Sequence, residues 1–330
     1  MTKVQLARQL MGGRLGGLVQ KITSQPGVLV LAYHRIGDGS TSPFDRGLWS
    51  ATPDNFERQV KFLKLHADPI GPEDLRAALN KKRDRHFLIT FDDGYRDNFD
   101  VVYPILKQHN IRAGFFLATG FIDVPIIPWW DEIAWMVRSS PLEELKASQW
   151  LSAPLKFDEP DRQLAVEHLL KIYKTMPGDR TAAFIEYLAT ATASGRCTAD
   201  AAKLWMNWDM IREMRGAGMW FGGHTHTHPI LSRLTRSQQL KEIATCRRRI
   251  EEELSQRMRW FSYPRGKPDA FDNETRDCLQ EEGVELAFTY YGGYERLEQW
   301  DAYDIRRTAV EMDTSMQQFR AMVQLPDFFA

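Results

Sequence analysis

The feature that most constrains this chain is an apolar run that leads directly into two adjacent carboxylates. Residues 87–91 are apolar or β-branched and predict a buried strand, which Asp92, Asp93 and Gly94 follow at once. Adjacent side chains on an extended backbone point in opposite directions, so Asp92 and Asp93 reach one cleft only where the strand has ended. The simpler alternative is a turn whose carboxylates cap the helix predicted over residues 97–109.

A histidine cluster lies about 130 residues downstream. Three of the eight histidines, His224, His226 and His228, follow the apolar residues 219–221. Two imidazoles and one carboxylate hold a divalent metal and leave coordination positions open. A turn would place His224 and His228 on one face, whereas an extended segment would align all three. Pro229 allows both conformations. The histidine pair together with the aspartate pair favours a metal site.

These two segments resemble the first two motifs of a known enzyme family. Residues 90–94 read TFDDG and residues 224–228 read HTHTH, and their order and spacing are similar to those of the polysaccharide deacetylases, carbohydrate esterase family 4. The similarity extends from about Gly27 onward. It implies that Asp92 is the general base. It also implies that a divalent metal, usually zinc, is held by three ligands, namely Asp93, His224 and His228. His226 occupies a variable motif position and is left out of the ligand set.

A further histidine follows the first predicted strand, at residues 28–34. A loop hydrogen bond is the simpler interpretation of His34. One branch of the deacetylases, however, carries a Tyr-His pair near the N-terminus, and its histidine is thought to replace a C-terminal Leu-x-His as the general acid. This chain has no histidine after His228. The resemblance therefore implies that His34 is the acid.

Residues 259–266 resemble the third family motif only in part. Ser262 stands where the family has an arginine that orients the base, and Tyr263 replaces a proline. Arg307 is a candidate replacement for the arginine, although a surface charge at a strand end is the simpler interpretation. The backbone N–H of Arg265 matches the position that helps to hold the oxyanion, and Tyr263 would form part of the groove wall. Tyr263, Arg265 and Arg307 are thus the expected substrate-binding residues.

The order of elements predicts an α/β fold. Strands and helices alternate as far as residue 119, which is typical of parallel strands with crossover helices. With the resemblance, we expect a distorted (β/α) barrel of about seven parallel strands over residues 27–330. Helical periodicity without a clear strand predicts a helical insertion at about residues 123–205. Three tryptophans could stack on sugars, but burial in the insertion core is commoner for this residue: Trp129, Trp130 and Trp135.

Charge and composition exclude several classes of protein. The net charge of −1 argues against a nucleic-acid partner, and three widely spaced cysteines favour a reducing compartment. No apolar run is long enough to span a bilayer. Residues 1–26 carry four basic residues and no acidic one, so they form a basic amphipathic segment that either packs on the barrel or contacts a membrane surface. We therefore expect a cytoplasmic protein, with peripheral membrane contact as the alternative.

The resemblance predicts metal-dependent hydrolysis of an N-acetyl group from an amino sugar in a polysaccharide or lipid-linked saccharide, with release of acetate. The same site could cleave an O-acetyl ester or a non-sugar amide. Iron-dependent oxygen chemistry is a further alternative, although the spare carboxylate Asp92 argues against it. A catalytically silent saccharide-binding module would also fit the incomplete third motif. No Gly-x-Ser-x-Gly elbow or phosphate-binding loop is present, which argues against serine hydrolases and nucleotide enzymes.

Overall fold

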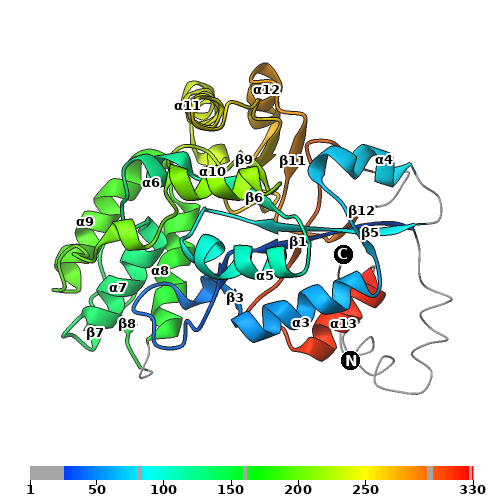
Figure 1. Cartoon of the computed structure of the whole chain (residues 1–330). Coiled ribbons are helices and arrows are strands. Elements are labelled where there is room, and N and C mark those ends of the chain that lie inside the picture. The colour runs from blue at the N-terminus through cyan, green and yellow to red at the C-terminus, as the bar shows by residue number, and fades with distance from the viewer. Residues whose placement is uncertain (1–25, 81–83, 159–161, 296–299, 327–328, 330) are drawn as a thin grey trace.

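A curled sheet of nine strands forms the centre of the molecule (Figure 1). The computed structural model describes residues 26–80, 84–158, 162–295, 300–326 and 329. Along the sheet the order is β11-β10-β9-β6-β5-β1-β12, with β13 paired to β1 and β4 paired to β5. The strands are β1 (Gly27–Tyr33), β4 (Asp68–Pro69), β5 (Arg85–Phe91), β6 (Gly114–Leu117), β9 (Trp220–Gly223), β10 (Trp260–Ser262), β11 (Leu286–Phe288), β12 (Tyr294–Glu295) and β13 (Thr308–Ala309).

Parallel pairing dominates this sheet. Strand β1 pairs in parallel with β5 over its whole length, and its pairing with β12 is antiparallel. The segment that leads into β13 joins the two sides of the sheet, because Ile305 bridges Phe288 of β11 while Thr308 pairs with Leu31 of β1. The prediction of a distorted (β/α) barrel with mostly parallel strands is therefore confirmed.

Helices cover the outside of the sheet (Figure 1). Helix α3 shows why they form: Thr52 caps its first turn, Pro53 opens it, and its buried side chains follow a helical period. The helices are α3 (Pro53–Lys64), α4 (Leu75–Leu79), α5 (Tyr103–Gln108), α6 (Thr119–Asp123), α7 (Trp129–Ser139), α8 (Gln163–Thr175), α9 (Thr181–Ala191), α10 (Trp208–Gly216), α11 (Arg236–Leu254), α12 (Asn273–Glu281) and α13 (Met316–Gln324). Among the described residues, no helix is long and apolar enough to cross a membrane.

The region expected to be a helical insertion contains α7, α8 and α9 and has an apolar core of its own. Helix α7 packs against both α8 and α9. Two short strands, β7 (Glu144–Leu145) and β8 (Leu155–Lys156), form an antiparallel pair in the same region. The expectation that this region lacks strands is wrong, because two-residue strands are too short to show a periodic pattern.

A second pair of short strands lies outside the main sheet. Strand β2 (Arg35–Ile36) pairs in parallel with β3 (Trp49–Ala51), directly after the end of β1. The expected basic amphipathic segment, residues 1–26, lies outside the described residues except for Pro26. Its packing and its contact with a membrane remain predictions.

Candidate metal centre and active-site pocket

The carboxyl ends of β1, β5, β9 and β10 lead into one pocket. Strand β5 ends at Phe91, and Asp93 and Gly94 then adopt left-handed conformations with φ of 77° and 91°. Such a conformation is uncommon for a residue other than glycine, and it interrupts the alternation of side chains along the strand. Asp92 and Asp93 both line the pocket as a result.

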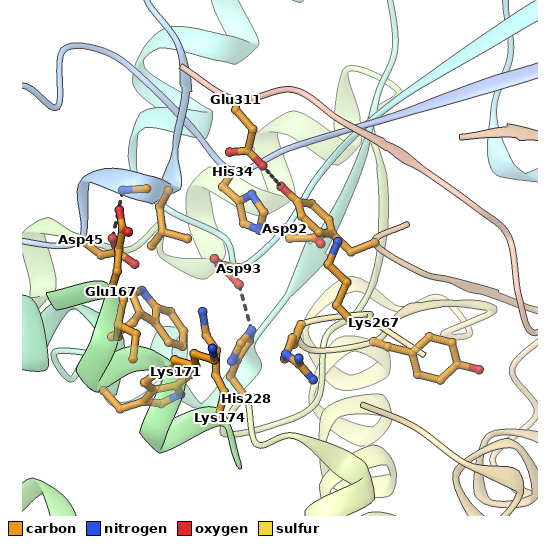
Figure 2. Close-up of a pocket in the computed structure, with 18 of the residues that line it drawn as sticks. His34, Asp45, Asp92, Asp93, Glu167, Lys171, Lys174, His228, Lys267 and Glu311 are labelled. Atoms are coloured by element: carbon orange, nitrogen blue, oxygen red, sulfur yellow. Dashed lines mark hydrogen bonds and ion pairs between the residues drawn. The ribbon is translucent and has the colours of Figure 1, made fainter. Parts of the chain in front are cut away.

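Asp93, His224 and His228 form a tight cluster, with ligand atoms that all lie within 4.8 Å of one another. The Oδ1 atom of Asp93 lies 3.4 Å from Nε2 of His224 and 3.3 Å from Nε2 of His228. The two Nε2 atoms are 3.1 Å apart. Asp93 and His224 are each 2% exposed, so the cluster is largely shielded from water. Figure 2 shows Asp93 and His228 facing each other.

The hydrogen bonds around the cluster fit a cation. Nδ1–H of His224 donates to the carbonyl of Ser262 at 2.7 Å, which leaves a lone pair on Nε2 toward the cluster. The Asp93 Oδ1 atom is buried and has no hydrogen bond among the described residues. A buried acceptor without a donor is costly, and a divalent cation between these atoms would satisfy it. The donor set of two imidazoles and one carboxylate suits zinc.

The loop that carries the histidines is a turn, which decides between the two conformations left open by the sequence. Thr225 and His228 have φ of 65° and 59°, and the His228 N–H donates to Oγ1 of Thr225 at 2.9 Å. His226 points away from the pocket, and its Nδ1 lies 3.0 Å from Oγ1 of Thr119. Glu242 on α11 fixes the loop by accepting the His226 N–H at 2.9 Å.

The electrostatics of the cluster keep the carboxylate ionised. Burial raises the pKa of Asp93, but the adjacent imidazoles of His224 and His228 outweigh burial and hold this pKa well below its usual value. Burial lowers the pKa of His228 below its usual value. Burial also lowers the pKa of His224, but the carboxylates of Asp92 and Asp93 outweigh burial and raise this pKa above its usual value. A metal ligand set requires both imidazoles in the neutral form, so a metal would displace any proton that His224 holds.

Asp92 has an environment of its own, although it directly precedes Asp93. The Arg307 guanidinium donates to both carboxylate oxygens of Asp92, at 2.8 and 2.7 Å. Ser262 Oγ donates to Asp92 at 3.2 Å and accepts from Arg307 at 2.7 Å. Burial raises the pKa of Asp92, but Arg307 and then His224 outweigh it, so the pKa lies below its ordinary value. Asp92 is therefore an ionised carboxylate in a fixed orientation.

Arg307 is fully buried, so the interpretation as a surface charge is wrong. Its Nε donates to the Thr289 carbonyl at 2.6 Å, and one terminal nitrogen donates to Thr90 Oγ1 at 3.1 Å. Arg307 has no exposed surface and does not line the pocket, so it holds Asp92 from behind the pocket wall and not at the surface expected of a substrate-binding residue. Its guanidinium also contacts Ser262, the residue that stands where the third family motif has its arginine.

His34 lies at the end of β1 and lines the same pocket. Its backbone is held at both polar groups: the N–H donates to Ser50 Oγ at 3.0 Å, and the carbonyl accepts from Asn98 Nδ2 at 2.9 Å. The ring packs edge-on to Tyr290 at 5.3 Å between centroids. Figure 2 shows His34 close to Asp92 and Asp93. A loop hydrogen bond of the His34 backbone therefore exists, but the imidazole itself faces the pocket.

The pocket has a volume of about 570 Å³, and α8 forms one of its walls. Trp130 packs edge-on to His228 at 4.5 Å, and Trp129 stacks on Tyr173 at 4.0 Å. Trp130 belongs to the apolar core of the insertion, and Trp129 and Trp135 pack against that core. Trp129 and Trp130 also line the pocket, whereas Trp135 does not. Tyr263 and Arg265 line the opposite side. The Tyr263 hydroxyl donates to the Tyr303 carbonyl at 2.9 Å, so only its ring is available as a wall.

Comparison with known proteins agrees with this arrangement. The sequence model named polysaccharide deacetylase matches residues 79–143 and 166–287, which is more than half of the chain. The chain belongs to the polysaccharide deacetylase family. YxkH of Bacillus subtilis (strain 168), which is named after the same family, is 31% identical over 100 residues. That match covers 29% of this chain and 33% of YxkH, so the chain matches about a third of that relative's length.

Solved structures share the fold of this chain. The Streptococcus pyogenes deacetylase PplD, solved with acetate, superposes with a TM-score of 0.60 at 17% identity and covers 92% of this chain and 99% of its own. IcaB from Ammonifex degensii gives a TM-score of 0.57 at 17% identity, with coverage of 92% and 98%. BC0361, a polysaccharide deacetylase from Bacillus cereus, gives 0.58 at 16% identity, with coverage of 91% and 69%.

Several residues around the site were not expected from the sequence. Ser262 was noted only as a departure from the family motif, yet its hydroxyl joins Arg307 to Asp92. Glu242 holds the histidine loop from α11, and no local pattern identifies it. Lys171 and Lys174 of α8 line the pocket, and their spacing of three residues on a predicted helix was the available signal.

Proposed function

We propose that this protein is a metal-dependent hydrolase that removes the N-acetyl group of an amino sugar in a polysaccharide or lipid-linked saccharide and releases acetate. One observation carries the proposal. An ionised carboxylate, Asp92, is held by Arg307 directly beside a buried triad with an unsatisfied carboxylate oxygen. A general base next to a separate metal ligand set is the arrangement that amide hydrolysis needs.

Asp93, His224 and His228 would hold a divalent ion, and their nitrogen and oxygen donors favour zinc. When bound, such an ion lowers the pKa of a coordinated water toward neutrality and polarises a carbonyl oxygen. The resident ligands are prepared for it, because the Nδ1–H of His224 is already committed to the Ser262 carbonyl.

Asp92 would take the proton of the attacking water. Arg307 donates to both oxygens of Asp92 and Ser262 donates to one of them, which leaves a lone pair on the other oxygen for a water in the pocket. The fork of Arg307 prevents rotation of the carboxylate toward the triad. Asp92 therefore stays available as a base and does not become a fourth ligand.

The two remaining roles fall to Arg265 and His34. Arg265 lines the pocket in a left-handed conformation, with φ of 62°, at the turn that follows β10. Its backbone N–H would donate to the oxygen that becomes negative as the carbonyl is attacked, and such donors contribute about 3 kcal/mol in comparable sites. His34, across the pocket, would donate a proton to the departing amine.

Acetate release from N-acetylglucosamine oligomers and lipid-linked acetylated saccharides tests the proposal. The assay uses protein stripped with a chelator and then reloaded with one metal at a time. We expect release that disappears on stripping and returns with zinc. Absence of acetate from every substrate at full metal occupancy would instead favour the saccharide-binding module, and release only from O-acetylated substrates would favour an esterase.

The role of His34 has a separate test. Replacement His34→Asn removes the proton donor, and an amine leaves poorly without a proton, whereas p-nitrophenolate leaves without one. We expect N-deacetylation to fall by about 10²–10⁴-fold while hydrolysis of p-nitrophenyl acetate falls much less. An equal loss on both substrates would show that His34 does not act as the acid.

A further inference from the structure

Two lysines of the insertion line the active-site pocket and have no carboxylate partner among the described residues. Lys171 and Lys174 lie three residues apart on α8, and both line the pocket. Within the described parts of the chain, neither ammonium group has a hydrogen bond or an ion pair to a carboxylate within 4 Å. Figure 2 shows both side chains reaching toward His228.

The acidic residues of the pocket, in contrast, are all engaged. Besides Asp92 and Asp93, the pocket contains Asp45, Glu167 and Glu311. Asp45 accepts the Gly47 N–H at 2.9 Å, and Glu167 accepts Nε2–H of Gln163 at 3.0 Å. Glu311 accepts the Tyr290 hydroxyl at 2.9 Å. The lysines therefore hold positive charge that the neighbouring acids do not pair with directly.

A continuous series of aromatic contacts connects Lys174 to the metal ligands. Its Nζ lies 5.9 Å from the ring centre of Trp129, which is 5.1 Å from that of Trp130. Trp130 in turn packs on His228 at 4.5 Å. Aromatic rings of this kind provide a surface for the apolar face of a sugar. Lys174 lies at the end of this surface that is far from the triad.

Burial and the nearby Arg265 disfavour the positive charge of Lys174, and Asp45 acts in the opposite direction. Like charges three residues apart on a helix repel each other. Partial burial lowers the pKa of Lys174 below its usual value, because a charged amine is poorly solvated there. Lys267 adds a third positive charge from the other side of the pocket, 5.3 Å from the Tyr290 ring. An anion bound between these groups would satisfy them.

We infer that Lys171 and Lys174 form an anion subsite, and that the acetylated saccharide bound here carries a carboxylate or a phosphate close to the sugar that is deacetylated. The inference rests on the proposed function and narrows its substrate class. A uronic acid neighbour and a sugar phosphate offer the same chemistry to a lysine pair, and the experiment below distinguishes them.

The test compares substrate pairs that differ in charge. Zinc-loaded protein is assayed for acetate release from a heparosan tetrasaccharide and from the neutral tetra-N-acetylchitotetraose, and from N-acetylglucosamine 1-phosphate and N-acetylglucosamine. A hydrogen bond between a lysine and an anion changes affinity by about tenfold. We expect kcat/KM for at least one acidic saccharide to exceed that for its neutral partner by about tenfold or more. The pair that shows this preference identifies the anion as a carboxylate or a phosphate.

Variants then connect that preference to the lysines. In the double variant Lys171→Gln with Lys174→Gln, we expect the ratio of acidic to neutral kcat/KM to fall toward one. Lys146→Gln is the matched control, because Lys146 is an exposed lysine of the same insertion that does not line the pocket, and it should keep the wild-type ratio. A wild-type ratio near one, or a preference that survives the double variant, would overturn the anion subsite.

Calorimetric binding of the same four saccharides separates this inference from the proposed reaction. If no saccharide releases acetate but the acidic ones bind wild type about tenfold more tightly than the double variant, the subsite is supported and the hydrolase proposal fails. If acetate is released with equal binding of acidic and neutral saccharides, the hydrolase proposal is supported and the subsite fails. Binding of none of the four contradicts the subsite as well.

Discussion

Asp92 and Asp93 are neighbours in the sequence and equally buried, at 2% exposure each, yet their charges are balanced in different ways. Asp92 accepts two hydrogen bonds from Arg307 and one from Ser262. Asp93 faces two imidazoles, and its Oδ1 has no hydrogen bond among the described residues. A buried carboxylate needs a compensating charge. Arg307 supplies this charge to Asp92, whereas on the proposed function a bound cation would supply it to Asp93.

Because Asp92 and Asp93 have identical side chains, only their surroundings can give them different functions. The ion pair with Arg307 holds Asp92 in place, and the left-handed backbone at Asp93 turns the second carboxylate toward the histidines that we propose as metal ligands. The assignment of base and ligand therefore depends on Arg307, which is more than 200 residues away in sequence.

The largest effect is expected for Asp93→Asn. The change removes the anionic ligand but keeps the size of the side chain, so the remaining two histidines should bind zinc weakly. Acetate release should fall below detection, and added zinc at micromolar concentration should not restore it. Unfolding by heat, followed by circular dichroism, provides the control for an intact fold. Wild-type activity in this variant would show that Asp93 is not a ligand.

A smaller loss is expected for Asp92→Asn. An amide cannot accept the proton of water, so kcat should fall by about 10²–10⁴-fold while KM changes little. Steady-state kinetics on an N-acetylglucosamine oligomer measures both constants. Full turnover in Asp92→Asn would exclude the assigned base.

Arg307→Lys tests how strongly the orientation of Asp92 depends on the guanidinium group. Its expected effect is smaller than that of either aspartate variant. Lysine keeps the positive charge but not the planar fork that binds both oxygens of Asp92. We expect kcat to decrease by about 10–100-fold, as for other residues that orient a reacting group, with the metal retained. Loss of the metal in this variant would mean that Arg307 supports the triad itself.

Asp131 is a third buried carboxylate, and its pKa is raised where those of Asp92 and Asp93 are lowered. Asp131 accepts the Tyr95 hydroxyl at 3.2 Å and the Asp45 N–H at 3.0 Å. Burial raises its pKa to about 7, against an opposing effect of Arg35. A carboxyl whose pKa is higher in the folded than in the unfolded protein stabilises the folded state fully at pH values below its unfolded pKa of about 4. This stabilisation is lost as the pH rises toward the folded pKa of about 7.

Asp131→Asn should therefore remove a pH dependence and leave turnover nearly unchanged. The asparagine resembles the protonated acid and does not titrate. The free energy of unfolding of the variant, relative to that of wild type, should therefore increase by on the order of 2 kcal/mol between pH 4 and pH 7. Urea unfolding at several pH values measures this difference. A constant difference across the range would contradict the raised pKa.

Much of this arrangement follows from local sequence, and the rest depends on tertiary packing. The buried run before Asp92 and the histidine spacing indicated a strand-end site, because strand ends and turn residues have short-range signals. The contact of Arg307 with Asp92 had no such signal, since it requires the segment before β13 to join β11 to β1. Helix α12 was not expected either, although its cap at Asp272 was readable.

The metal content of three purified proteins tests the central claim most directly. Wild type, Asp92→Asn and Asp93→Asn are loaded with zinc, passed through a desalting column and analysed by mass spectrometry for bound metal. The account predicts one zinc per chain in wild type and in Asp92→Asn, and almost none in Asp93→Asn. Retention of zinc by Asp93→Asn with its loss from Asp92→Asn would contradict the assigned roles.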